Sequence, residues 1–196
     1  MLMVKLKGSE TEKNLLKAFA GESQARNRYT YFASVAKKDG FEQISAIFEE
    51  TAMNEKEHAE IFFKHLREGE GEALEIVASY PSGKIGTTEE NLLAAANGEK
   101  EEFGSIYPEF EKVARKEGFA LVADSFKEIA EVEEQHEKRY RKLLENVKNK
   151  TVFKKKQTVK WKCRNCGYVH EGTDAPDVCP ACKHAKAYYE VLAENY

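Results

Sequence analysis

The chain has 196 residues, of which 41% are hydrophobic and 33% are charged, which suits one domain of ordinary size with a small appendage. It contains no apolar run of about 18 residues, and its first residues are too few for a signal peptide, so we expect a cytoplasmic protein that does not enter a membrane. Residues 1–150 hold 23 basic and 29 acidic side chains, a net charge of −6, whereas residues 151–196 hold 8 and 5, a net charge of +3. An acidic body of this kind argues against nucleic acid as the partner.

Two long helices are predicted in the first half of the chain. Ser9 and Glu12 form a capping box, which predicts a helix over residues 9–38 that stops at Gly40. A second helix is predicted over residues 41–68, where apolar residues recur at helical spacing until a pair of glycines follows.

The second half of the chain repeats this arrangement. Residues 70–86 hold three glycines and one proline, which predicts a long crossover without regular structure. Behind it, a Thr-Thr-Glu-Glu capping box predicts a helix over residues 87–117, and a last helix is predicted over residues 119–149. Two helix pairs joined by one long crossover have the topology of a ferritin-like four-helix bundle.

Each predicted helix interrupts its apolar stripe with acidic residues near its middle. Spacings of three and four residues place these acids and two histidines on the same faces as the core residues. The residues concerned are Glu22, Glu55, His58, Glu99, Glu102, Glu133 and His136. Most of the 34 acidic residues belong on solvated helix faces, so the position of these five glutamates on buried faces sets them apart.

Five buried carboxylates need a cationic partner, because burying an unpaired ionised carboxylate costs several kcal/mol or more. Two histidines and Arg26, the basic residue expected nearby, do not balance five negative charges. Two ferrous or two ferric ions bring four or six positive charges and keep the cluster near neutral in both states. One Glu from each of two helices, with Glu-x-x-His from each of the other two, is also the ligand pattern of di-iron bundles. The sequence therefore predicts a site for two iron ions per chain.

An internal repeat relates the two helix pairs. Lys-Asp-Gly-Phe at residues 38–41 returns as Lys-Glu-Gly-Phe at residues 116–119, an offset of 78. The same offset relates Tyr29 to Tyr107, Glu55 to Glu133 and His58 to His136. Glu22 matches Glu99 at an offset of 77, so the third helix holds one extra residue after Glu99. Since helices commonly absorb one extra residue as a π-bulge, we predict a bulge within residues 99–107 that brings Glu102 to the metal.

Tyr29 and Tyr107 fall about two helical turns from Glu22 and Glu99. One interpretation makes them ordinary core tyrosines. The other makes them hydrogen-bond donors to the metal-binding carboxylates, and on that basis they are candidate catalytic residues.

All four cysteines lie in the last 34 residues, as the pairs Cys163 with Cys166 and Cys179 with Cys182. Two Cys-x-x-Cys pairs in a cytosolic chain indicate one tetrahedral metal site. Iron and zinc both accept four thiolates, so a structural zinc ribbon remains the alternative. Because the composition changes near residue 150, we expect a bundle over residues 1–150 and a small metal-binding domain with short β-strands over residues 151–196.

The chain resembles the rubrerythrin family over essentially its whole length. The resemblance rests on Ala20–Tyr29 (AGESQARNRY), both Glu-x-x-His motifs, Gly98-Glu99 with Glu102, and Cys163–Tyr168 (CRNCGY) with Cys179–Cys182. It implies a mainly α fold, a ferritin-like bundle followed by a rubredoxin-like domain. It also implies a di-iron site of two ions and one Fe(Cys)₄ iron per subunit.

The resemblance further implies a peroxidase that reduces hydrogen peroxide to water and protects against oxidative stress. Electrons would pass from an external reductase or rubredoxin through the Fe(Cys)₄ centre to the di-iron site. Homodimers or larger assemblies are implied, as is an exchange of Glu102 for His58 on one iron upon reduction. Two other functions stay open: a ferroxidase or iron-storage protein, and a zinc-ribbon adaptor on a helical bundle.

Overall fold

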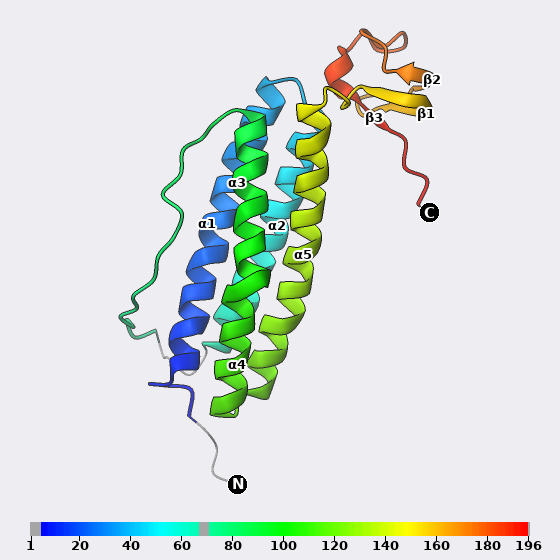
Figure 1. Cartoon of the computed structure of the whole chain (residues 1–196). Coiled ribbons are helices and arrows are strands. Elements are labelled where there is room, and N and C mark those ends of the chain that lie inside the picture. Colours follow the sequence, from blue (N-terminus) through cyan, green and yellow to red (C-terminus); the bar gives the residue numbers. More distant parts are fainter. Residues whose placement is uncertain (1–4, 67–70, 196) are drawn as a thin grey trace.

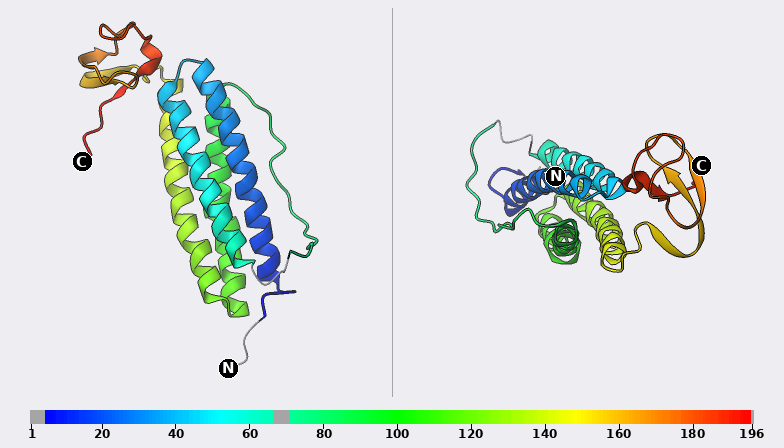
Figure 2. Two further views of the ribbon diagram at one scale, coloured as in Figure 1. Left: turned by 180° about the vertical axis from the view of Figure 1, so that it is seen from behind. Right: turned by 90° about the horizontal axis from the view of Figure 1, so that it is seen from above.

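The computed structural model describes residues 5–66 and 71–195. Four helical rods run side by side in the described part, with a small β-sheet domain at one end (Figure 1). The rods are α1 (Glu10–Lys38), α2 (Glu42–His65), the stack of α3 (Thr88–Glu101), η2 (Glu102–Ile106) and α4 (Tyr107–Glu117), and α5 (Ala120–Lys148). Seen from above, the rods surround a common core (Figure 2). The predicted mainly α, ferritin-like bundle is confirmed.

The ends of the helices follow the predicted capping residues closely. Ser9 Oγ accepts a hydrogen bond from the Glu12 N–H at 3.0 Å, but the Glu12 carboxylate accepts from Gly8 rather than Ser9, so this capping box is only half formed. The second capping box, at the start of α3, is complete. Gly40 and Gly118 lie in the left-handed region, with φ of 83° and 89°, and end their helices as predicted.

Two details differ from the sequence prediction or refine it. Helix α2 ends at His65, earlier than predicted, and the predicted end at residue 68 lies outside the described residues. The third rod contains a π-helical turn, Glu102–Ile106, in which the Tyr107 N–H bonds to the Glu102 carbonyl. This turn lies inside the predicted range 99–107, so the π-bulge is confirmed.

The two helix pairs hold one another by matching contacts. Asp39, at the end of α1, accepts hydrogen bonds from the N–H and the hydroxyl of Thr88 at 3.2 and 2.6 Å. Glu117, at the end of α4, accepts from the N–H and the hydroxyl of Thr11 at 2.8 and 2.5 Å. In each case a carboxylate from one pair satisfies free N–H groups in the first turn of the other. The internal repeat therefore builds a pseudo-symmetric bundle.

The bundle core consists of two hydrophobic clusters. One cluster, toward the β-sheet domain, includes Tyr29, Phe32, Phe48, Leu92 and Tyr140. The other, toward the far end, includes Leu15, Phe62, Tyr107, Phe126 and Ile129. In every rod the acidic residues of the predicted site lie between the two clusters, so apolar side chains enclose the site from both ends.

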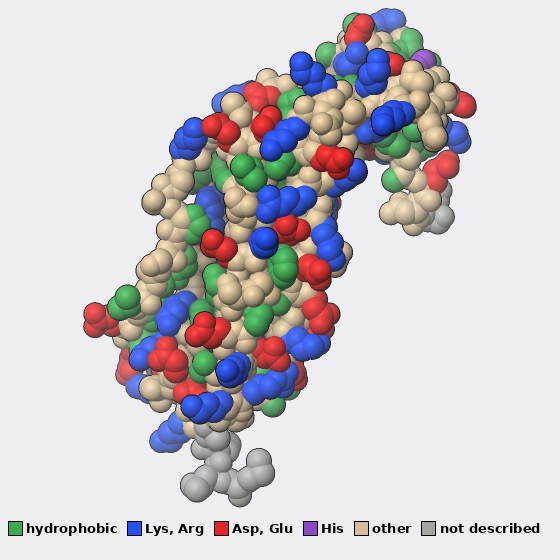
Figure 3. Space-filling model, viewed as in Figure 1, with side chains coloured by type: hydrophobic (Ala, Val, Ile, Leu, Met, Phe, Trp, Pro, Cys, Tyr) green, Lys and Arg blue, Asp and Glu red, His purple; other side chains and the backbone are tan. Residues whose placement is uncertain are grey.

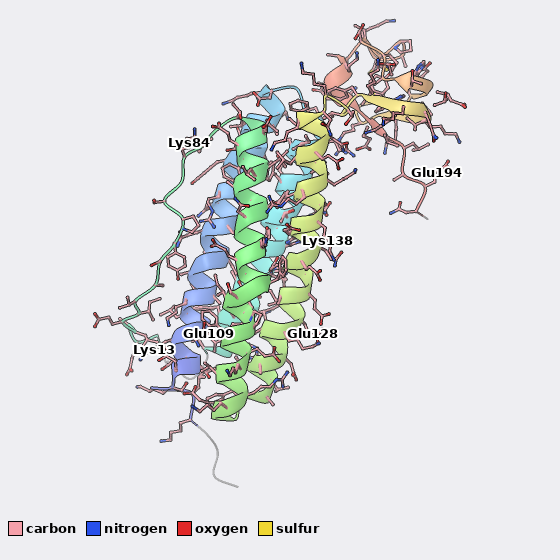
Figure 4. The ribbon with its side chains drawn as sticks, viewed as in Figure 1. Lys13, Lys84, Glu109, Glu128, Lys138 and Glu194 are labelled. Atoms are coloured by element: carbon pink, nitrogen blue, oxygen red, sulfur yellow. The ribbon has the colours of Figure 1, made fainter. Side chains whose placement is uncertain are left out.

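The crossover and the outer faces of the helices form the surface of the bundle. Residues 71–87 pass along the outside from the end of α2 to the start of α3 (Figure 1). Tyr80 anchors this segment by donating to the Lys17 carbonyl at 2.8 Å. Basic and acidic side chains alternate over the visible face (Figure 3), and Glu128 and Lys138 point away from the bundle (Figure 4). None of the helices in the described ranges has the length and apolar character needed to cross a membrane.

The small domain contains an antiparallel sheet of three strands in the order β2-β1-β3. The strands are β1 (Lys154–Cys163), β2 (Val169–Asp174) and β3 (Tyr189–Val191), with a 3₁₀ turn, η3 (Lys186–Tyr188), before the last. Trp161 is fully buried and packs with Tyr189 beside the cysteines. The ring of Phe153 stacks on that of Phe41, with centroids 6.0 Å apart, and so joins the domain to the α1–α2 turn.

Candidate metal centres

Six of the seven predicted bundle residues come together in two groups. One group is Glu22, Glu55, His58 and Glu133, the other is Glu55, Glu99, Glu133 and His136, and the donor atoms within each group lie within 4.8 Å of one another. All six side chains are buried. Because Glu55 and Glu133 belong to both groups, their carboxylates are placed to bridge two ions. Glu22 with His58, and Glu99 with His136, are placed to complete one ion each.

The donor atoms have the spacing of ligands on a common ion. His58 Nδ1 lies 2.8 Å from Glu55 Oε2 and 2.8 Å from Glu133 Oε1. His136 Nδ1 lies 2.7 Å from Glu133 Oε2 and 3.2 Å from Glu55 Oε1. Two donors at right angles on an ion with bonds of about 2.1 Å are separated by about 3 Å. The histidine nitrogens and the carboxylate oxygens are therefore spaced as ligands of shared ions would be.

Most donor atoms in the cluster make no well-aligned hydrogen bond among the described residues, even where a histidine nitrogen and a carboxylate oxygen lie close together. They are Glu22 Oε2, Glu55 Oε1, Glu99 Oε2, both oxygens of Glu133, and His136 Nδ1. Buried polar atoms are nearly always paired, and leaving one unpaired costs about 1–3 kcal/mol, or more for a charged group. Two cations would satisfy these atoms together, so the donor set fits a pair of metal ions.

The pKa values of the cluster show which positive charges balance its carboxylates when no cation is bound. Burial and neighbouring carboxylates raise the pKa of Glu22 and Glu99 well above the ordinary value. Burial lowers the pKa of His58 and His136, but Glu133 and Glu55 outweigh it and raise these values to about 10 and 9. Protons therefore balance the carboxylates, and metal ions that bind here displace them.

The two predicted tyrosines each reach a terminal carboxylate on the opposite repeat. Tyr29 Oη donates to Glu99 Oε1 at 2.5 Å, and Tyr107 Oη donates to Glu22 Oε1. In both cases the second oxygen of the carboxylate is left without a hydrogen bond in the described structure, free to bind an ion. The geometry thus agrees with the hydrogen-bond interpretation of these residues, while their catalytic role stays a prediction.

Glu102 is the one predicted ligand that the structure does not bring into either group. It begins the π-helical turn and lines, with Tyr107, a cavity of about 250 Å³ beneath the crossover. Burial and nearby carboxylates raise the pKa of Glu102 well above its ordinary value, and the charge of Arg28 acts against this rise. Arg26, the cation expected from the sequence, is exposed, so that expectation is wrong. Arg28, which lines the same cavity as Glu102, has the position expected for Arg26.

The four cysteines converge in the small domain. Their Sγ atoms lie within 4.8 Å of one another, and Cys163–Cys182 and Cys166–Cys179 are each 3.7 Å apart. A tetrahedron with metal–sulfur bonds of about 2.3 Å has sulfur–sulfur edges of about 3.8 Å. All four cysteines are free of disulfides. The thiols are therefore placed as four ligands of one ion.

Two similar loops shape this thiol site. After each Cys-x-x-Cys motif a residue with positive φ turns the chain, Gly167 at 80° and Lys183 at 64°. Backbone hydrogen bonds close the loops, from Gly167 to the Cys163 carbonyl and from Lys183 to the Cys179 carbonyl. A hydrogen bond from the His184 N–H lowers the pKa of Cys182 to about 6, which favours the metal-binding thiolate.

Comparison with known proteins identifies the family. The family model described as Rubrerythrin matches residues 13–144, and the model described as Rubrerythrin, rubredoxin-like domain, matches residues 161–190. Rubrerythrin of Nitratidesulfovibrio vulgaris is 57% identical over 194 residues, which cover 99% of this chain and 100% of that protein. The chain belongs to the rubrerythrin family. The family predicted from the sequence motifs is thus confirmed, together with the rubredoxin-like domain that rubrerythrins carry.

Solved structures support the same assignment. Nigerythrin in its fully reduced, all-ferrous state aligns with a TM-score of 0.63 at 30% identity, covering 98% of this chain and 92% of that one. Bacterioferritin from Desulfovibrio desulfuricans, described with its di-iron site in different catalytic states, aligns with a TM-score of 0.63 at 25% identity, covering 72% and 82%. With the geometry above, the two donor sets of this rubrerythrin family member are those of a di-iron centre and a rubredoxin-type iron centre.

Proposed function

We propose that the protein is a peroxidase that reduces hydrogen peroxide to water and serves in protection against oxidative stress. The observation that carries the proposal is the fusion of a four-thiolate site to a pair of metal positions that share two carboxylates. The proposed di-iron ligands are Glu22, Glu55, His58, Glu99, Glu102, Glu133 and His136, and those of the single iron are Cys163, Cys166, Cys179 and Cys182. We place the boundary between the two domains at residue 150.

The reaction needs two electrons and two protons for each peroxide, and it yields two molecules of water. When bound, the two ferrous ions supply one electron each to break the O–O bond. Glu55 and Glu133, which belong to both donor groups, would hold the two ions side by side. Tyr29 and Tyr107 keep the terminal carboxylates oriented through their hydrogen bonds.

The cavity beside the site is the proposed entry for peroxide. It lies under the crossover, and Tyr107 and Glu102 form part of its wall. Off the metal, the Glu102 carboxylate lies where it can take up a proton and pass it to a departing oxygen, and burial, which raises its pKa, favours this uptake. In the oxidised state the Glu102 carboxylate would bind iron in place of His58.

Electron supply argues for an assembly of chains. The part of α5 from His136 to Lys148 rises about 18 Å, and the thiol site lies beyond it in the small domain (Figure 1). A second subunit whose thiol site approaches the di-iron site shortens this path. We therefore propose a homodimer or larger assembly, with an external reductase or rubredoxin as the electron donor. The cytoplasmic location stays a prediction.

Turnover distinguishes this function from its main alternative. Iron-loaded protein supplied with a reductase and its reductant is expected to consume peroxide continuously, in amounts far above the protein concentration. The alternative, suggested by the similarity to bacterioferritin, is a ferroxidase or storage protein. Such a protein would consume peroxide in a single burst in proportion to its bound iron and then stop. A zinc-ribbon adaptor gives neither response.

A further inference from the structure

Glu102 and Arg28 share one cavity, and neither has an ordinary structural role there. Glu102 lies outside both donor groups, although its side chain is half-buried and lines the cavity. The half-buried Arg28 side chain forms no hydrogen bond or ion pair with any residue that the structure describes. Lys17, the other cation in the cavity wall, is already engaged, at 3.2 Å from both Glu10 and Asn14. Of the two cations in this cavity wall, Arg28 is therefore the one without a charged partner among the described residues, and its charge acts on the Glu102 carboxyl.

We propose that Arg28 is the positioning partner of Glu102: it holds the Glu102 carboxylate in the cavity whenever that side chain is off the iron. The inference rests on the proposed function, in which Glu102 and His58 exchange as ligands. A carboxylate that leaves a metal in a buried site loses its counter-charge, and an uncompensated buried charge is strongly unfavourable. A guanidinium offers a planar fork of donors that matches both carboxylate oxygens.

The location of the pair favours this role. Arg28 lies on the flank of α1 that faces α3, and it lines both cavities under the crossover together with Gly98. Glu102 begins the π-helical turn that follows α3. The Glu102 carboxyl therefore lies within electrostatic reach both of Glu55 and Glu133 in the proposed metal site and of the Arg28 guanidinium. Two positions of comparable stability are what a ligand exchange requires.

A consequence for the redox equilibrium follows. In the proposed function Glu102 is off the iron in the reduced state, so a partner for the released carboxylate favours the ferrous form. Arg28 thus raises the midpoint potential of the di-iron site. Its positive charge acts in the same direction by simple electrostatics, and the experiment has to separate these two effects.

Redox titration of the iron-loaded protein, followed by the absorbance of the di-iron site, separates the docking of Glu102 from the simple electrostatic effect of Arg28. It requires no measurement of turnover. We expect Arg28→Gln to lower the midpoint potential of the di-iron site. A tenfold decrease in the equilibrium constant for reduction lowers the potential by about 59 mV for a one-electron step. Arg28→Lys should recover part of the shift. Arg26→Gln, an exposed change of the same charge on the same helix, should leave the potential unchanged. Thermal melting of the iron-free variants checks that they fold.

The decisive comparison repeats Arg28→Gln in a Glu102→Gln background. If Arg28 holds Glu102, the shift is clearly smaller there, because no carboxylate is left to dock. An equal shift in both backgrounds, or no shift at all, overturns the proposal. A wild-type protein that fails to turn over peroxide overturns the proposed function instead, and the titrations still report on Arg28 and Glu102.

Discussion

Replacing Tyr29 with phenylalanine tests the hydrogen bonds that join the two repeats at the metal site. The substitution keeps the ring, which is 2% exposed, and removes only the Oη that lies 2.5 Å from Glu99 Oε1. A hydrogen bond to a charged acceptor contributes about 1.5–3 kcal/mol, which corresponds to about 10- to 150-fold in a binding constant. We therefore expect iron to bind about 10- to 100-fold more weakly at the position formed by Glu99 and His136.

The assay is competition between the protein and an iron chelator. Tyr31→Phe is the matched control, because it removes the same hydroxyl from the same helix at a residue that is 51% exposed. In the iron-free protein the raised pKa of Glu99 keeps this carboxyl protonated, so Tyr29→Phe should lower the melting temperature less than it does in the iron-loaded protein. An affinity that stays within about threefold of wild type, or an equal loss in Tyr31→Phe, contradicts the reasoning, since a loss of at least about tenfold is expected.

Three further predictions follow from the same geometry. Glu133→Gln removes a carboxylate that both donor groups share, so metal analysis should show loss of both bundle irons but not of the thiolate-bound iron; a chain that keeps all its iron would refute the bridging role. In the iron-free protein, the pKa values of His58 and His136 are raised to about 10 and 9. The two protonated histidines therefore contribute fully to folding stability below the ordinary pKa of 6.5, and this contribution is lost as the pH rises through 9 to 10. The melting temperature of the iron-free protein should therefore fall across that pH range, whereas iron, which displaces the protons, should bind more tightly. A melting temperature that does not change would contradict the proposed cluster. Phe126→Ala, at a fully buried residue, should cost about 3–5 kcal/mol in chemical denaturation, whereas Leu121→Ala at 77% exposure should stay within about 0.5 kcal/mol; equal losses would contradict the assigned core.

Local rules were sufficient to predict the helices and much of the site. Capping residues and glycines with positive φ mark the starts and ends of helices, because they allow hydrogen bonds to the backbone N–H and C=O groups that have no partner within the helix. The one-residue difference between the two repeats predicted the π-helical turn at Glu102–Ile106, since an inserted residue has to be absorbed in the backbone. Periodicity alone placed six of the seven acids and histidines in one cluster.

The remaining features depend on contacts between helices, which spacing does not encode. Arg26 lies four residues from Glu22 and so looks closer to the site, but the buried residues Ala25 and Phe32 turn α1 so that Arg28 faces the cavity instead. Periodicity indicates which face of a helix is buried and not which neighbour each flank meets. The position of the Glu102 side chain was not predicted for a related reason: spacing predicts the π-helical turn but not the direction in which the side chain at its start points, and Glu102 lies outside both donor groups. The caps that Asp39 and Glu117 provide across the repeat were missed because they join residues far apart in the sequence.

The metal content of the intact protein tests the central claim most directly, that the buried glutamates and histidines of the bundle and the four cysteines hold a redox-active set of irons. Native mass spectrometry of protein purified without added metal, with elemental analysis and a visible spectrum, measures it in one preparation. We predict three irons per chain, two in the bundle and one on the cysteines, with ferric–thiolate absorption and no zinc. Zinc on the cysteines, or a bundle that binds fewer than two irons, would contradict the account.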